Sequence, residues 1–189
     1  AMLAALSKRK AGGGGGEVRI PLADVGIATI ANLGQLAETL QSGDRERLGN
    51  TVFGAFGRDF KAADGKRLMV MAITPRQWKG LVSVLGIGEA VAGIEASRGV
   101  SFDRDEGVRF EHRDALFPLV EAAVARRTSD ALATAFDANG CCWGPYQEMH
   151  EAVADPKLVR DNPLFAEITQ VSGKRYPVPG AMATLPAHA

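Results

Sequence analysis

Residues 56–78, FGRDFKAADGKRLMVMAITPRQW, restrict the possible folds of this chain more than any other stretch. Asp64-Gly65 stands between two strand-like runs and is a strong signal for a β-hairpin, with RLMVMAI as a largely buried second strand. Directly afterwards, Thr74 can cap a helix, Pro75 suits its first position, and Gln77 completes a capping box. The sequence therefore predicts a hairpin that leads at once into a helix, as in a small α+β unit.

Helical and strand-like patterns continue on both sides of this unit. Residues 23–43 carry apolar side chains at a nearly helical period, and residues 112–128 are typical of an amphipathic helix. Residues 129–140 have a further helical pattern, with Ser129 as the expected cap and Gly140 as its end. The remaining predictions are a loop at 100–111, a short strand followed by helices within 141–162, and a hairpin at 165–180 that turns at Ser172-Gly173.

Five consecutive glycines, residues 12–16, stand near the start of the chain and raise the question of a phosphate-binding loop. Such a loop follows a strand and opens a helix, so that backbone N–H groups converge on the anion. Here the glycines follow the helical run MLAALSKRK and precede EVRIPL, residues 17–22, in which Val18 and Ile20 alternate with charged side chains. The order of elements favours a flexible helix-to-strand linker over a ligand loop.

The composition narrows the classes of function. The 189 residues include 22 basic and 22 acidic side chains, so the chain offers no general attraction to nucleic acid or to an anionic membrane. Its apolar runs are all shorter than the roughly 20 residues of a membrane span, and its start lacks the pattern of a signal peptide. We therefore expect a cytoplasmic globular protein with neither nucleic acid nor membrane as a partner.

The pattern of possible metal ligands predicts no metal site. Cys141 and Cys142 are neighbours, which rules out an ordinary disulfide between them, and they lack the C-x-x-C spacing of zinc sites, so we expect buried thiols. The acidic residues within 103–106 lack the spaced ligands and the closing Glu of a calcium loop. The histidines stand in unrelated contexts, as surface or cap residues, at His112, His150 and His188.

The densest unusual stretch is RLGNTVFGAFGRDF, residues 47–60, where glycines interleave with phenylalanines ahead of the hairpin. One interpretation is a mobile lid that closes over a substrate and excludes water. The other is a domain linker anchored in the core by its phenylalanines. Arg58 can pair with a carboxylate or a phosphate through its planar guanidinium. The candidate substrate-binding residues are Asn50, Gly54, Phe56, Gly57 and Arg58.

Three stretches, in the same order, resemble the class III CoA-transferases, the family of formyl-CoA transferase and α-methylacyl-CoA racemase. Residues 2–25, MLAALSKRKAGGGGGEVRIPLADV, are similar to the family's successive motifs "LLAAL", "TGxGQ" and "VDVSLxDA". Residues 56–78 are similar to "YxTADGxxxAVGAxxPxxW", and residues 154–168, ADPKLVRDNPLFAEI, to "DPxLxxRGxFxEV". The resemblance spans nearly the whole chain, and the shared order of the motifs makes it specific.

The resemblance implies an α/β fold in three parts. Residues 1–48 are expected to belong to a Rossmann-like large domain, residues 49–145 to a smaller α+β domain, and residues 146–189 to a tail that returns to the large domain. It also implies acyl-CoA as the substrate, no cofactor besides that coenzyme A, and an interlocked homodimer. In the family a glycine-rich loop at the position of residues 49–57 covers the reacting groups, where backbone N–H groups can stabilise an oxyanion.

The family's nucleophile is an Asp carboxylate that attacks the acyl-CoA thioester, forms a mixed anhydride and releases the CoA thiolate. By the resemblance, that Asp lies upstream of Ala1, and neither Asp24 nor Asp59 matches it. We therefore expect no catalytic residue within these 189 residues. The chain looks like a C-terminal fragment, and we expect no turnover of CoA thioesters by the chain alone.

Within the family, the similarity is greatest to enzymes that move CoA between the two carboxyl groups of one C5 dicarboxylate. Such a substrate has a free carboxylate, and Arg58 is the candidate for holding it. A racemase is disfavoured because Thr74 stands where racemases carry a supporting Glu. The alternatives that stay open are an intermolecular CoA-transferase, a racemase, and a truncated, non-catalytic module that associates with a complete chain.

Overall fold

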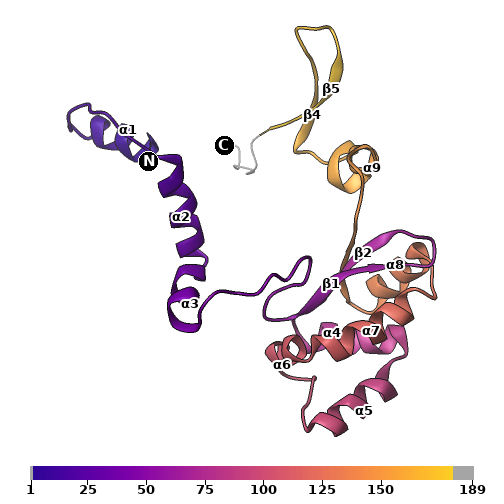
Figure 1. Ribbon diagram of the computed structural model, residues 1–189. Coiled ribbons are helices and arrows are strands. Elements are labelled where there is room, and N and C mark those ends of the chain that lie inside the picture. Colours follow the sequence, from indigo (N-terminus) through magenta and orange to yellow (C-terminus); the bar gives the residue numbers. More distant parts are fainter. Residues whose placement is uncertain (1, 181–189) are drawn as a thin grey trace. The chain divides into compact units, whose positions relative to one another are not determined.

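Figure 1 shows the computed structural model, which describes residues 2–180. Contacts within the chain divide it between Arg47 and Leu48 into two compact units. His188 and the end of the expected tail, residues 181–189, lie outside the described residues. The division into three parts, including the assignment of residues 1–48 to a Rossmann-like domain, stays a prediction.

The first unit is helical. Helix α1 spans Met2–Lys10, α2 spans Leu22–Asn32 and α3 spans Gln35–Ser42. The single helix predicted over residues 23–43 is interrupted at Gly34, whose φ of 82° lies in the left-handed region that glycine tolerates best. Within the described residues 2–47, no residue of these three helices is buried. Their apolar side chains therefore form no core inside the unit.

The strand predicted at residues 17–22 is wrong for the described chain. Residues 13–21 have no regular structure, and α2 begins at Leu22. Alternating apolar residues form a strand only where a neighbouring strand completes the backbone hydrogen bonds, and residues 2–47 contain no strand. The glycine run does form a connection after a helix, as predicted.

The second unit contains a three-stranded antiparallel sheet with the order β1-β2-β3. The predicted hairpin is confirmed, because its strands pair from Phe56 opposite Ala72 to Lys61 opposite Arg67. Gly65 in the turn has a φ of 83°, which explains the glycine there. β1 is an edge strand of this sheet. The strands are β1 (Phe56–Lys61), β2 (Arg67–Ala72) and β3 (Cys142–Pro145).

Helices pack with this sheet around one apolar core (Figure 1). The core forms where alternate residues of β1 and β2 meet α4, α7 and α8, and Phe56, Phe60 and Trp78 are among its largest buried side chains. The predicted capping box of α4 is confirmed, since the Thr74 hydroxyl accepts from the Gln77 N–H and the Gln77 side chain accepts from the Thr74 N–H. The helices are α4 (Pro75–Leu85), α5 (Gly88–Arg98), α6 (Glu106–Glu111), α7 (Arg113–Val124) and α8 (Ser129–Ala138).

Two local predictions in this unit are wrong because of side-chain capping. Residues 106–111 form α6 where a loop was expected, since the Asp105 carboxylate accepts from the backbone N–H two residues later, at 2.8 Å. Thr128, and not Ser129, caps α8. The Ser129 hydroxyl instead donates to Asp64 in the hairpin turn at 2.6 Å, which ties α8 to the sheet.

The last part of the described chain follows β3. Cys141 and Cys142 are free thiols that are half-buried, so the expectation that both are buried is wrong. The helices and the hairpin predicted after β3 are confirmed, and so is the α/β class of the whole chain. The elements are α9 (Met149–Ala154), a π-helical turn η1 (Pro156–Arg160), and an antiparallel pair of β4 (Phe165–Thr169) and β5 (Arg175–Pro179).

Candidate functional site

A polar pocket of about 660 Å³ lies beside β1 and is formed entirely by residues of the second unit. The segment just before β1 contributes residues 48–51, and the sheet and α7 contribute charged side chains. Such a mixture of backbone and charged groups suits a polar ligand. The lining includes residues 48–51, Arg58, Asp59, Lys61, Arg67 and Glu121.

Side chains of a strand point alternately to its two faces, and this explains how Arg58 of β1 reaches the pocket. Phe56 and Phe60 point into the core, so Arg58 between them begins on the same face of the sheet. An unpaired guanidinium inside an apolar core is energetically costly. Because β1 is an edge strand, the long Arg58 side chain can extend over the apolar side chains and reach a polar partner outside the core. The Arg58 guanidinium carbon lies 5.1 Å from the Phe60 ring centroid and 4.8 Å from that of Phe117. These rings fix the position of the guanidinium.

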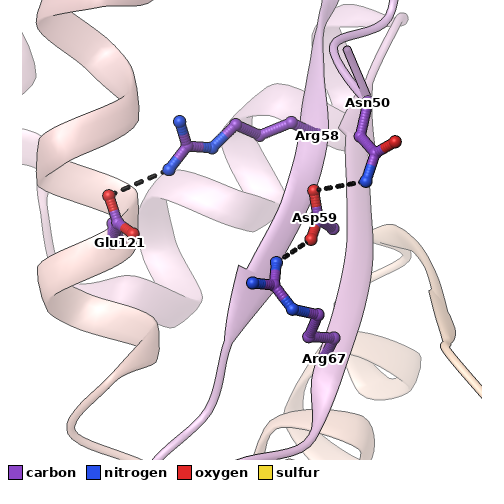
Figure 2. Close-up of polar contacts among 5 residues, drawn as sticks. All are labelled: Asn50, Arg58, Asp59, Arg67 and Glu121. Carbon is purple, nitrogen blue, oxygen red and sulfur yellow. Dashed lines mark hydrogen bonds and ion pairs between the residues drawn. The ribbon is translucent and has the colours of Figure 1, made fainter.

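Arg58 ends in a single ionic contact with α7 (Figure 2). Its Nη2 donates to Oε2 of Glu121 at 2.9 Å. The Arg58 side chain is 29% exposed and that of Glu121 is 56% exposed. Among the described residues, the buried Nε of Arg58 has no hydrogen-bond partner. The donor edge formed by Nε and Nη2, which can hold a carboxylate by both oxygens, is therefore only half used.

Asp59 lies on the other face of β1 and is fixed by two donors (Figure 2). Asn50 Nδ2 donates to Asp59 Oδ1 at 3.2 Å, and Arg67 Nη1 donates to Asp59 Oδ2. Burial raises the pKa of Asp59, but the hydrogen bonds from Asn50 and Arg67 and the charge of Arg67 outweigh it, so the pKa lies below its ordinary value. Asp59 is therefore an ion that ties the segment before β1 to the sheet.

Glycines let that segment run close to β1. The Val52 N–H donates to the Gly57 carbonyl at 2.8 Å. A Cβ added to Gly57 would lie 2.9 Å from Val52 Cγ2 and 3.0 Å from Met71 Cγ, so this approach requires a glycine. Gly54, in the turn that leads into β1, has a φ of 76°, which also favours glycine.

The structure brings two of the five candidate residues together in the pocket. Asn50 and Arg58 line it, whereas Gly54 and Gly57 shape the neighbouring segment without lining it. Phe56 is fully buried in the core, which is the position that the linker interpretation expects for a phenylalanine of this stretch. The role of residues 49–57 as a lid stays a prediction.

The sequence alone does not single out Asp59, Arg67 or Glu121 as pocket residues. For Asp59 and Arg67 the hairpin register is a usable signal, because it sets Lys61 opposite Arg67 and leaves Asp59 diagonal to Arg67 on the same face. Glu121 has no such signal, since it comes from a helix 63 positions after Arg58.

The charges of the pocket favour an anionic ligand. The negative charge of Asp59 balances the positive charge of Arg67. Glu121 is then the one acidic side chain of the described lining left to balance both Arg58 and Lys61. Among residues 2–180, no group of three or more His, Cys, Asp or Glu side chains is placed to hold a metal ion. None of the helices in that range is both long and apolar enough to cross a bilayer. The fold is α/β, and the pocket beside β1 carries three basic and two acidic side chains, a balance that suits a carboxylate or a similar anion.

The chain belongs to CoA-transferase family III, whose model matches residues 1–188. Over 182 residues it is 40% identical to 2-methylfumaryl-CoA isomerase of Chloroflexus aurantiacus. This match covers 95% of the chain and 44% of the isomerase, so the chain spans less than half the length of that relative.

Two solved structures share the fold. One is Rv3272 from Mycobacterium tuberculosis, with a TM-score of 0.71 and 23% identity over 99% of this chain and 46% of that protein. The other is a CAIB/BAIF family protein from Brucella suis, with a TM-score of 0.70 and 21% identity over 98% of this chain and 45% of that protein. At these identities the likeness concerns the fold alone.

Proposed function

We propose that the protein containing these residues is an enzyme that transfers CoA between the carboxyl groups of one molecule, as an isomerase of the 2-methylfumaryl-CoA type. The observation that carries this proposal is the 40% identity to such an isomerase across 95% of the chain. Because the chain spans 44% of that relative, the proposed activity is that of a complete enzyme to which the pocket beside β1 contributes.

In this proposal Arg58 holds the substrate carboxylate that is not esterified to CoA. Its guanidinium is positioned on the Phe60 and Phe117 rings, and its Nε has no partner in the described structure. A carboxylate that accepts from both Nε and Nη2 would satisfy this buried donor and form the stronger, charge-assisted type of hydrogen bond. Lys61 adds a second positive charge to the same pocket.

The covalent step requires a carboxylate nucleophile, which we place upstream of Ala1. Its attack on the thioester carbonyl carbon forms a mixed anhydride and expels the CoA thiolate, which then attacks the enzyme carbonyl and frees the substrate acid. The second carboxylate of that acid attacks the enzyme-bound thioester, which expels the CoA thiolate and forms a second mixed anhydride. The thiolate then attacks the substrate carbonyl of this anhydride, which forms the isomeric thioester and frees the enzyme carboxylate. Asp59 does not suit the nucleophilic role, because both of its oxygens accept hydrogen bonds and its side chain is 8% exposed.

The segment before β1 suits the task of excluding water during these steps. It lies on the pocket, begins its turn at glycines with positive φ, and is tied down through Asn50 and Asp59. Closing such a segment over a mixed anhydride would protect it from hydrolysis. We include this lid role in the proposal.

A homodimeric state and a cytoplasmic location are further parts of the proposal, both drawn from the similarity to the family. The first unit supports an assembly of some kind, since Val25, Ile27 and Ile30 of α2 are between 43% and 54% exposed. Apolar surface of this kind is normally covered by another part of a protein or by a partner. Light scattering on the purified protein measures the number of copies directly.

The experiment that tests the function uses the longest in-frame protein that contains this chain. The protein is incubated with 2-methylfumaryl-CoA, and chromatography follows the isomer with CoA on the other carboxyl group. We expect conversion without any added acid. Conversion that depends on an added carboxylic acid would indicate an intermolecular CoA-transferase, and no CoA transfer under either condition would contradict the proposal.

A further inference from the structure

We infer that Glu121 is an internal carboxylate that occupies Arg58 until the free carboxylate of a substrate replaces it. Glu121 then sets how strongly the site favours substrates that carry such a group. This inference rests on the proposed function, because it takes Arg58 as the residue that binds the substrate's free carboxylate.

The two ion pairs of the pocket differ in a way that points to Glu121. Asp59 accepts from Asn50 and Arg67 and is 8% exposed, so it is held from both sides. Within residues 2–180 the Glu121 carboxylate makes one ion pair, at 2.9 Å to Arg58, and its side chain is 56% exposed. A pair of the second kind contributes little to stability and separates at small cost. Of the two carboxylates, Glu121 is the one that a ligand can displace.

Arg58 stays in place when Glu121 leaves. Its guanidinium rests on the Phe60 and Phe117 rings, and both phenylalanines belong to the buried core. Glu121 already uses Nη2, and the neighbouring Nε is the buried donor without a partner. A ligand carboxylate that takes both donors needs the Nη2 that Glu121 occupies, so ligand and Glu121 compete for one position.

Displacement of Glu121 needs no movement of α7. The helix is anchored by Phe117, Val120 and Val124, which are buried, whereas Glu121 lies on the exposed side. A change of side-chain rotamer is enough to open the contact, and such changes on exposed side chains take place in picoseconds to nanoseconds. The pocket of about 660 Å³ beside the pair leaves room for the ligand.

The first test measures binding of the 2-methylfumarate dianion to the 189-residue chain by NMR, using the backbone amide signals of β1 and α7, which every variant retains. Glu121→Gln keeps the size of the side chain and removes its charge. We expect it to bind the dianion about two- to fivefold more tightly than the original chain, because the competing pair is removed. Asp114→Asn, an exposed change at the other end of α7, is the matched control and leaves the affinity unchanged.

The outcomes separate the inference from the proposed function. If Arg58→Ala loses binding while Glu121→Gln binds as the original chain does, the inference is overturned and the role of Arg58 stands. If neither the original chain nor Glu121→Gln responds to the dianion, the inference and the proposed role of Arg58 both fall.

The second test is kinetic and uses the longest in-frame protein that contains this chain. We expect Glu121→Gln to lower KM for 2-methylfumaryl-CoA about two- to fivefold while kcat changes less than about twofold, since the effect is on binding. CoA transfer with an unchanged KM overturns the inference alone. Absence of CoA transfer in every variant, the original included, overturns the proposed function.

Discussion

At the scale of single residues, the pocket depends on how each charged side chain is compensated. Asp59 accepts hydrogen bonds from both Asn50 and Arg67. Arg58, in contrast, has one exposed partner, Glu121, and its Nε donor has no hydrogen-bond partner in the described structure. The first group therefore has a structural task and the second is available to a ligand. We therefore expect replacements in the first group to affect folding and replacement of Arg58 to affect binding.

Replacement of Asp59 tests the structural task. Asp59→Asn removes the charge that accepts from Asn50 and Arg67, and we expect a loss of about 1–2 kcal/mol in the free energy of unfolding at pH 7. Urea unfolding of the 189-residue chain measures this loss. Asp114→Asn, which is exposed and outside the pocket, is the control and should change stability by less than about 0.5 kcal/mol.

The pH dependence of that loss follows from the sign of the pKa shift. Because the folded-state pKa of Asp59 lies below its ordinary value, its contribution is fully present above the unfolded-state pKa of about 3.9 and is lost as the pH falls through the folded-state pKa. The difference between Asp59→Asn and the original chain is therefore constant near neutral pH and shrinks below about pH 4. A difference that grows on acidification would show that Asp59 is not the ion described above.

At the scale of helices and strands, the sequence predicts correctly those elements that depend on interactions between residues close in the chain. The hairpin at Asp64-Gly65 and the capping box at Thr74 are confirmed because turn and cap residues act within a few positions. The strand at residues 17–22 is not formed, since a strand depends on a partner that its own sequence cannot reveal. The contact of Glu121 with Arg58 is missed for the same reason.

Arg109 joins elements that the sequence does not connect. It is fully buried, its Nη2 donates to the Ile73 carbonyl at 2.8 Å, and its Nη1 donates to the Phe102 carbonyl. Burial lowers the pKa of Arg109, while the acidic side chains nearby oppose that change. The guanidinium therefore links α6 to the start of α4 and to the loop before α6.

Loss of this link should destabilise the second unit. We expect Arg109→Ala to lower the free energy of unfolding by about 2–4 kcal/mol, because two buried carbonyl groups lose a charged donor. Arg109→Lys should recover only part of this, since an ammonium lacks the planar fork that reaches both carbonyls. Tryptophan fluorescence during urea unfolding provides the measurement. Arg104→Ala, an exposed change in the preceding loop, is the control, and an Arg109→Ala variant as stable as this control would refute the link.

At the scale of the whole molecule, the two units differ in how they are held together. The second has a core of buried aromatic and aliphatic side chains from its sheet and helices. In the first, the helices α1, α2 and α3 contain no buried residue within the described range, and large apolar side chains such as Leu22, Leu33 and Leu40 are exposed. The apolar pattern of residues 23–43 thus predicts helix correctly and says nothing of what covers it.

Hydrogen exchange tests this contrast in the 189-residue chain. Amides of α1, α2 and α3 should exchange near the rates of an unfolded chain, because short helices without buried contacts open readily. Amides of β2 and α4, which lie in the core, should be protected at least about 100-fold more. Equal protection of both units would show that the first has a source of stability other than a core of its own.

We propose above that the Arg58 pocket binds the free carboxylate of a CoA ester. The most direct measurement compares kcat/KM for 2-methylfumaryl-CoA between Arg58→Ala and the original form of the longest in-frame protein that contains this chain, with Arg104→Ala as the control. A monocarboxylic acyl-CoA, exchanging with its own labelled acid, provides the comparison substrate. We expect Arg58→Ala to lower kcat/KM roughly 100-fold or more for 2-methylfumaryl-CoA and less than about threefold for the monocarboxylic ester. An unchanged kcat/KM for 2-methylfumaryl-CoA, or an equal fall for both substrates, would contradict it.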